Sequence, residues 1–370
     1  MGKSTSMDTS LKNVYITYGA LVTPLGNTVD KNFSALKEGK SGIKKYTNSG
    51  FTNENWPLAK IEQISENRFD TLLRTSFIEL NQKVSIATLT SSDTLVIVST
   101  TKANIDVFPN DTFESGVTIL KNELGIVNEP IIVSNACISG VVAINLAADY
   151  IRADKFKDVI VIGIDVVSDF VIHGFQSLYA ISEEAAKPFD KERTGITLGE
   201  GVAIVILSSE KRNSAFHVKY LNGSSSNDAN HISGPSRTGE GLVRSIQKTL
   251  ERSHINKDQI DFISAHGTGT IYNDEMESIA FDRLELNTKS FNSLKGYFGH
   301  TLGAAGVIET IVCLLSMEHN LVFKSLGYTT LGTSKSLNLA TDTSQTQVNT
   351  VLKTASGFGG GNASLILIKD

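Results

Sequence analysis

The chain has 370 residues, of which 40% are hydrophobic and 20% are charged, and its formal net charge is −5 at pH 7. This length is sufficient for one large domain or two average ones with substantial cores. The acidic balance and the lack of a Lys/Arg block argue against a nucleic-acid-binding surface. We also expect no apolar run long enough to span a membrane.

The first ten residues, MGKSTSMDTS, are polar and lack the apolar core of a signal peptide. Residues 1–12 are expected to be a flexible N-terminus or an artificial leader ahead of a native start at Met7. The only cysteines are Cys137 and Cys313. So few cysteines in a chain of this size favour the reducing cytoplasm over secretion.

Short β-branched runs alternate with longer amphipathic stretches along the chain. In the first half, strands are predicted at 13–23, 93–100, 129–135, 157–165 and 201–209, and helices at 29–39, 116–125 and 139–154. In the second half, strands are predicted at 215–221, 259–267, 350–356 and 363–370, and helices at 239–254, 273–286 and 304–317. The alternation predicts a largely α/β chain, and 222–236 is its most loop-like segment.

Two apolar helices begin in the same way. Cys137 is followed after three residues by Gly140, and His300 is followed after three residues by Gly303. Two copies of one structural unit would explain this pattern, although two matches of this kind are weak evidence for duplication by themselves.

Cys137 lies where the strand-like run EPIIVSN ends and a helix of small residues begins. The N–H groups and positive end of such a helix are expected to lower a thiol pKa and favour the nucleophilic thiolate. The alternative is a cysteine that serves as a small buried apolar residue. Cys313 fits that alternative, because it lies mid-helix among apolar neighbours in TIVCLLSM, with no polar partner expected.

Two further segments offer polar groups for catalysis. In SAHGTGT, His266 follows a strand and precedes the hydroxyls of Thr268 and Thr270; the alternative is an ordinary loop histidine. In SLKGYFGHTLGAAG, Lys295 and His300 lie in a glycine-rich turn before an apolar helix; the alternative is a packing turn with a surface lysine.

A histidine at a helix start favours its neutral form, which is able to donate a hydrogen bond to an oxyanion. Glu309, farther along that helix, is a candidate partner for Lys295. The glycines of SGFGGGNAS (356–364) permit tight turns and backbone N–H donation to an oxyanion. The remaining histidines show no metal-ligand spacing, so neither a metal nor another cofactor is expected.

Taken together, NACISG, KPFDKERTGITLGEG, AHGTGTIYNDEMES and KGYFGHTLGAAGVIE resemble, in order, the motifs of the elongating β-ketoacyl-acyl carrier protein synthases of the thiolase superfamily. The resemblance implies an α/β class with a duplicated α/β/α/β/α five-layer fold. Its halves would be residues 13–215, with the nucleophile, and 216–370, with both histidines and the lysine. It also implies an acyl carrier protein as partner and a homodimer or a heterodimer.

The resemblance also implies a role for each residue. Cys137 matches the nucleophile that accepts the acyl group, and its N–H and that of Phe358 match the oxyanion hole. His266 and His300 match the histidines that support malonyl decarboxylation and stabilise the enolate. Lys295 matches a structural and electrostatic lysine of the family, with Glu309 as its partner. Thr268 and Thr270 match residues that contact the phosphopantetheine arm. Phe358 matches the residue that gates the acyl pocket.

The sequence departs from the family at several points. It is short between Ile43 and Ile131, where dimer contacts and part of the acyl pocket are expected, and it has Asn135 and Ile196 at positions where the family often has Thr and Phe. The resemblance implies a condensing synthase of fatty acid or polyene/polyketide biosynthesis, and these departures favour a specialised one, such as one for polyene or pigment-type polyketides, over the housekeeping fatty-acid enzyme. The alternatives are a non-catalytic chain-length-factor-like partner subunit, which would lack Cys137, and a thiol acyltransferase or hydrolase on the same fold.

Overall fold

The computed structural model describes residues 12–212, 216–228 and 234–370. Within them, eleven strands form one hydrogen-bonded sheet made of two similar halves. The first half runs, in order, through β5 (Ile131–Val133), β4 (Thr94–Ser99), β6 (Asp158–Asp165), β8 (Gly201–Ser208) and β1 (Val14–Val22). The second runs through β9 (Val218–Asn227), β16 (Gly361–Lys369), β15 (Thr350–Gly357), β10 (Phe262–Ser264), β11 (Ser290–Asn292) and β13 (Asn338–Leu339).

The two halves have the same strand directions. In the first, β4 is parallel to β5 and β6, and β8 is antiparallel to β6 and β1. In the second, β10 is parallel to β11 and β15, and β16 is antiparallel to β15 and β9. The halves meet where β1 pairs with β9 over only three residue pairs. The topology therefore repeats once along the chain.

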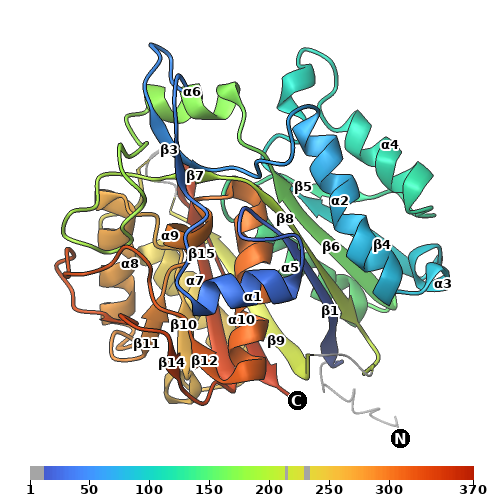
Figure 1. The fold of residues 1–370 in the computed structure, drawn as a ribbon. Coiled ribbons are helices and arrows are strands. Elements are labelled where there is room, and N and C mark those ends of the chain that lie inside the picture. Colours follow the sequence, from blue (N-terminus) through green and yellow to red (C-terminus); the bar gives the residue numbers. More distant parts are fainter. Residues whose placement is uncertain (1–11, 213–215, 229–233) are drawn as a thin grey trace, which may run out of the picture.

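Helices and the two half-sheets alternate in five layers (Figure 1). The outer layers are formed by α2 (Arg68–Lys83) and α4 (Glu114–Glu123) on one side and α7 (Glu240–Ser253) and α8 (Ile271–Arg283) on the other. The layer between the half-sheets consists of α5 (Ser139–Arg152) and α10 (Ala305–His319). The prediction of a thiolase-like five-layer α/β fold is confirmed.

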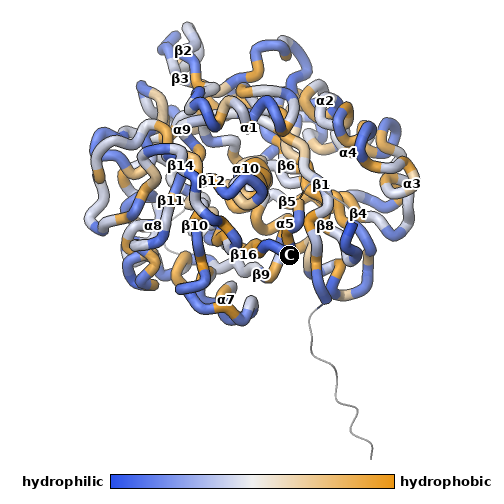
Figure 2. The backbone as a smooth tube through the Cα atoms, turned by 60° about the horizontal axis from the view of Figure 1, so that its bottom comes forward, coloured by the Kyte–Doolittle hydropathy of each residue, from blue (hydrophilic) through white to orange (hydrophobic). Residues whose placement is uncertain are grey.

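The largest cluster of buried apolar residues surrounds α5 and α10 and includes the strands that pack against them. All eight residues of β6 are buried, as expected for a strand rich in β-branched residues whose two faces contact two different core clusters. Gly140 and Gly306 let α5 and α10 cross closely, because a Cβ on Gly140 would lie 2.8 Å from the Cα of Gly306. Figure 2 shows hydrophobic residues along these inner elements and hydrophilic ones on the outer turns.

One helical stretch, Leu302–His319, is long and apolar enough to cross a membrane by length and composition, so the prediction that no such run exists is wrong. Within the fold, 89% of that stretch is buried. It includes α10, which lies between the two half-sheets (Figure 1). Its hydrophobicity is that of a core helix, surrounded by protein on all sides.

The duplication is real, but its register differs from the predicted one. Ala136 and Leu302 both have positive φ (45° and 52°), and the helices that follow begin three residues later, at Ser139 and Ala305. The contacting glycines Gly140 and Gly306 then occupy the second helical position. The counterpart of Cys137 is therefore Gly303, and the predicted match of Cys137 with His300 was wrong by three residues.

The remaining elements connect or cover the layers: α1 (Val29–Lys37), β2 (Lys44–Tyr46), β3 (Trp56–Ala59), α3 (Ile86–Leu89), α6 (Asp169–Ser177), β7 (Leu198–Gly199), α9 (Lys295–Phe298), β12 (Leu321–Val322) and β14 (Ser344–Gln345). Residues 222–227, predicted to be a loop, instead extend β9, where they pair with β16. The leader assigned to residues 1–12 lies almost entirely outside the described residues, as does the boundary predicted between 215 and 216.

Candidate active site

Cys137 lies in the tight turn between β5 and α5. The turn is closed by the Ser139 hydroxyl, which accepts a hydrogen bond from the N–H of Asn135 (2.7 Å) and donates one to the carbonyl of Ala136 (2.6 Å). Ala136 adopts a left-handed conformation, so the chain reverses sharply just before the cysteine. This geometry presents the buried thiol at the start of α5, as predicted.

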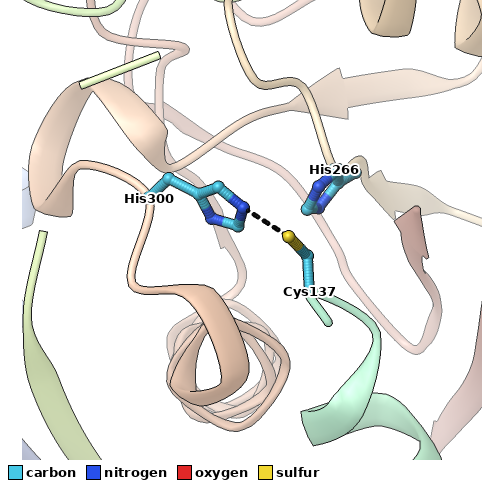
Figure 3. A group of neighbouring side chains, drawn as sticks. All are labelled: Cys137, His266 and His300. Atoms are coloured by element: carbon cyan, nitrogen blue, oxygen red, sulfur yellow. Dashed lines mark hydrogen bonds between the residues drawn. The ribbon is translucent and has the colours of Figure 1, made fainter. Parts of the chain in front are cut away.

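The two predicted histidines lie beside that thiol (Figure 3). The His300 Nε2 is 2.9 Å from the Cys137 Sγ, and the His266 and His300 rings are 5.2 Å apart in an edge-to-face arrangement. Potential ligand atoms of all three residues lie within 4.8 Å of one another. His266 follows β10 and His300 follows α9, so three distant segments meet at one point.

Lys295 is buried below the histidines rather than exposed at the surface. Its ammonium donates a hydrogen bond to the His266 carbonyl oxygen (3.0 Å) and forms an ion pair with Glu309 on α10. The predicted partnership of Lys295 and Glu309 is therefore present in the structure. It ties the backbone of the His266 loop to the central helix.

Two acidic residues that the sequence reasoning did not single out hold the His266 loop from the other side. Glu277 accepts the N–H groups of His266 (2.9 Å) and Gly267 (2.7 Å), and Asp274 accepts that of Thr268 (2.9 Å). Both carboxylates belong to α8 and are buried. The sequence did contain a signal for this contact. Asp274 and Glu277 are three residues apart on a helix that begins just after the glycine-rich turn, so both lie on one face of that helix.

A pocket of about 400 Å³ leads to the three side chains. Thr268, Thr270 and Ile196 line it, and the two threonine hydroxyls are 3.0 Å apart. Phe358 and Phe175 also line it, and their rings stack with centroids 5.6 Å apart. All the predicted site residues except Lys295 and Glu309 thus face the pocket, and those two lie behind it.

Burial dominates the electrostatics of the site. It raises the pKa of Cys137 to about 11, against the opposing effects of Lys295, Lys102 and the Phe358 N–H. The prediction of a lowered thiol pKa at the helix start is therefore wrong for the resting site. Burial, followed by Lys295, also lowers the pKa of both His266 and His300 well below the ordinary value, so both imidazoles are neutral, as predicted for His300.

The resting pair is consequently a thiol next to a neutral imidazole. His300 is placed to accept the thiol proton as the sulfur attacks. In the part of the chain that the structure describes, Cys137, His266 and His300 are also the one group of three His, Cys or acidic side chains close enough to hold a metal ion. The expectation of no metal or cofactor stays a prediction.

Comparison with known families agrees with these features. The family model for the beta-ketoacyl synthase N-terminal domain matches residues 112–213, and that for the C-terminal domain matches residues 219–329. The first match includes Cys137, and the second includes His266, Lys295, His300 and Glu309. Together the two matches span more than half of the chain.

Curated relatives and solved structures extend the match. The chain is 27% identical to 3-oxoacyl-[acyl-carrier-protein] synthase 2 of Coxiella burnetii over 96% of the chain and 98% of that protein. It is 31% identical to the tetracenomycin polyketide synthase ketoacyl synthase alpha subunit of Streptomyces glaucescens over 64% of the chain and 59% of that protein. A chain of the ketosynthase–chain length factor complex of Xenorhabdus doucetiae superposes with a TM-score of 0.88 at 25% identity, covering 98% of this chain and 100% of that one.

Proposed function

Because the chain belongs to the β-ketoacyl synthase family and is a condensing acyltransferase of fatty acid or polyketide biosynthesis, we propose that Cys137, His266 and His300 carry its two half-reactions. The single observation behind this assignment is the 2.9 Å contact between the Cys137 sulfur and the His300 imidazole, at the end of an open pocket and beside a second imidazole.

In the first half-reaction, the Cys137 sulfur attacks the thioester carbonyl of an acyl group delivered on phosphopantetheine. The thiol proton moves to the His300 Nε2, and the pantetheine thiol leaves with that proton. The N–H groups of Cys137 and Phe358 are the proposed donors to the tetrahedral oxyanion. The Phe358 N–H already faces the Cys137 sulfur in the resting site, which supports its assignment.

In the second half-reaction, the bond between the malonyl methylene carbon and its carboxylate breaks and carbon dioxide leaves. The released electron pair forms a thioester enolate whose oxygen accepts hydrogen bonds from the neutral imidazoles of His266 and of His300, the latter in the tautomer that carries its proton on Nε2. The enolate carbon then attacks the acyl-enzyme carbonyl, and the carbon–sulfur bond to Cys137 breaks. The departing thiolate takes one proton from solvent and restores the resting thiol.

Thr268 and Thr270 are proposed to contact the phosphopantetheine arm, since both line the pocket on the way to Cys137. Phe358, stacked on Phe175, is proposed as the gate between that arm and the acyl group. Lys295 and Glu309 are proposed to position His266 and set the charge of the site. No metal or other cofactor takes part in these steps.

For partners, we propose an acyl carrier protein and a second ketosynthase-like subunit, either identical or different, in the cytoplasm. The strand β5 lies at the edge of the sheet order and its residues Ile131 and Ile132 are only partly buried. An apolar strand edge next to the nucleophile turn is a surface that a second chain is able to extend.

The test is acyl loading followed by condensation. The purified chain is incubated with an acyl-acyl carrier protein and then with malonyl-acyl carrier protein, with intact mass and carbon dioxide release as readouts. We expect one acyl adduct per chain, lost on Cys137→Ala, and carbon dioxide release in step with 3-oxoacyl product. Acyl loading without carbon dioxide release would instead support a thiol acyltransferase or hydrolase, and neither event would support a non-catalytic partner subunit.

A further inference from the structure

A second buried lysine, Lys353 on β15, lies beside the active-site ion pair and has no role in the steps above. Its Nζ is 2.7 Å from the Oε2 of Glu309, while the other oxygen of that carboxylate binds Lys295. Both lysines and Glu309 are almost completely buried. One carboxylate on α10 therefore bridges two ammonium groups from two different elements.

Both ammonium groups also bind the segment that carries His266. Lys295 donates to the carbonyl oxygen of His266 (3.0 Å), and Lys353 donates to that of Ser264 (3.3 Å). These two carbonyls lie on either side of Ala265. The segment thus contacts, at two points, two cations that share one carboxylate, and Lys353 also donates to the carbonyl oxygen of Thr354 in its own strand.

The three groups do not balance in charge. Two ammonium groups and one carboxylate leave one buried positive charge without an opposite charge, and burying such a charge destabilises the fold. Burial is the largest cause that lowers the pKa of both His266 and His300, and Lys295 is the next; Lys353 acts in the same direction, after His300 for His266 and after Lys102 for His300. The excess charge therefore disfavours protonation of the imidazoles.

Other charged and titratable groups face the same imidazoles. The Cys137 thiol contacts His300, and Glu277 on α8 accepts the backbone N–H of His266. Burial and Asp274 raise the pKa of Glu277 to about 7, so this carboxylate also titrates near neutral pH. Any change in the titration of the histidines must be separated from that of Glu277.

We propose that Lys353 is a positioning residue of the reaction: through Glu309 it completes the clamp on the His266 segment, and together with Lys295 it leaves one positive charge in excess of that carboxylate beside both imidazoles. The role of that charge during condensation rests on the proposed function, because it would oppose the negative charge of the enolate. The neutrality of the resting imidazoles does not rest on it.

The experiment measures the imidazoles directly. The pH titrations of His266 and His300 are followed by NMR of the 13C-histidine-labelled chain, with each signal assigned by single substitution. Lys353→Met removes the charge and the donor, Lys353→Gln removes the charge and keeps a donor for Ser264, and Lys369→Met on β16 is the matched control. The double variant Lys353→Met/Glu309→Gln restores the net charge of the wild-type site.

We expect the pKa of both histidines to rise by about one unit in Lys353→Met and Lys353→Gln, the usual scale for loss of a nearby charge. It should return towards the wild-type value in the double variant and stay unchanged in Lys369→Met. An independent step near pH 7 belongs to Glu277 and should appear in every variant. Because these titrations need no substrate, a failure of the proposed condensation leaves them interpretable.

Unchanged titrations in a folded Lys353→Met chain would overturn the proposal. If both single variants fail to fold, the double variant decides: wild-type-like histidine titrations support the proposal, and titrations displaced upward by a full unit contradict it. As an activity readout, the acid limb of kcat/KM should move to higher pH in Lys353→Met and Lys353→Gln alike, whereas a purely structural role would lower kcat without moving that limb.

Discussion

Glu309→Ala tests how much the fold depends on the charge arrangement behind the active site. The substitution leaves the ammonium groups of Lys295 and Lys353, with exposed fractions of 1% and 0%, without their shared carboxylate. Removing one partner of a buried ion pair costs about 3–5 kcal/mol, because the remaining charge is buried and unpaired. We therefore expect Glu309→Ala to lower the free energy of unfolding by at least about 3 kcal/mol at neutral pH.

The lowered pKa of Glu309 also predicts how the stability deficit of Glu309→Ala depends on pH. Burial alone would raise the pKa of Glu309, but Lys295 and Lys353 outweigh it and lower the pKa below the ordinary value of 4.5. A carboxyl group whose pKa is lower in the folded chain adds stability above its unfolded pKa and loses it as pH falls through its folded pKa. The deficit of Glu309→Ala should thus be constant at pH 6–8 and shrink only below about pH 4.5.

The assay is urea and thermal denaturation followed by circular dichroism, with Glu318→Ala as the control. Glu318 belongs to the same helix, but its side chain is 35% exposed and its Oε2 is as far as 3.9 Å from the Nε2 of His319. The removal of this weak surface pair should cost less than about 1 kcal/mol of stability. A Glu309→Ala chain as stable as Glu318→Ala would refute the reasoning that the lysines are charged and dependent on this carboxylate.

Four further outcomes are expected. Alkylation of Cys137 by iodoacetamide should accelerate about tenfold per pH unit from pH 7 to 10, because its pKa is about 11; a plateau near pH 8 would show the thiol to be far more acidic. Cys313→Ala should retain turnover within about twofold, since Cys313 is buried on the central helix outside the pocket, and a loss of turnover with an unchanged melting temperature would contradict this. His300→Ala should slow acyl loading by about 10²–10⁴-fold, the usual contribution of a general base, as measured by rapid-quench intact mass. His266→Ala should slow carbon dioxide release more than loading, because its ring does not hydrogen-bond the Cys137 sulfur; equal losses in both steps would remove the distinction between the two histidines.

The inner elements β6 and α5 were predictable because their local patterns are distinctive. The run DVIVIGID in β6 has β-branched residues at five of its eight positions, and the helix of small residues after Cys137 follows a strand closely. The helix α2 was missed although its buried residues Phe69, Leu72, Leu73, Phe77 and Leu80 recur at helical spacing. The extension of β9 through NGSSSN was hidden because polar residues that read as a loop pair with β16 instead.

The active site shows a sharper limit. Motif residues such as His266 and Lys295 were found because each stands in a distinctive local pattern. Lys353 was not, because in TVLKTAS it reads as one polar position in a strand, and only the fold places it against Glu309. The sign of the thiol pKa was mispredicted for the same reason, since the burial that raises it comes from segments distant in sequence.

The asymmetry of the duplicated fold explains why one half alone does not make this site. Five residues separate β5 from α5, but twelve separate β11 from α10, and the longer connection contains both Lys295 and His300. The symmetric position to Cys137 is Gly303, whose N–H donates to the buried carboxylate of Asp165 at 2.7 Å, so the second half has a structural turn where the first has a nucleophile. The connection that contains Lys295 and His300 is therefore seven residues longer than its counterpart in the first half. The close crossing of α5 and α10 at Gly140 and Gly306 places that connection beside the Cys137 turn.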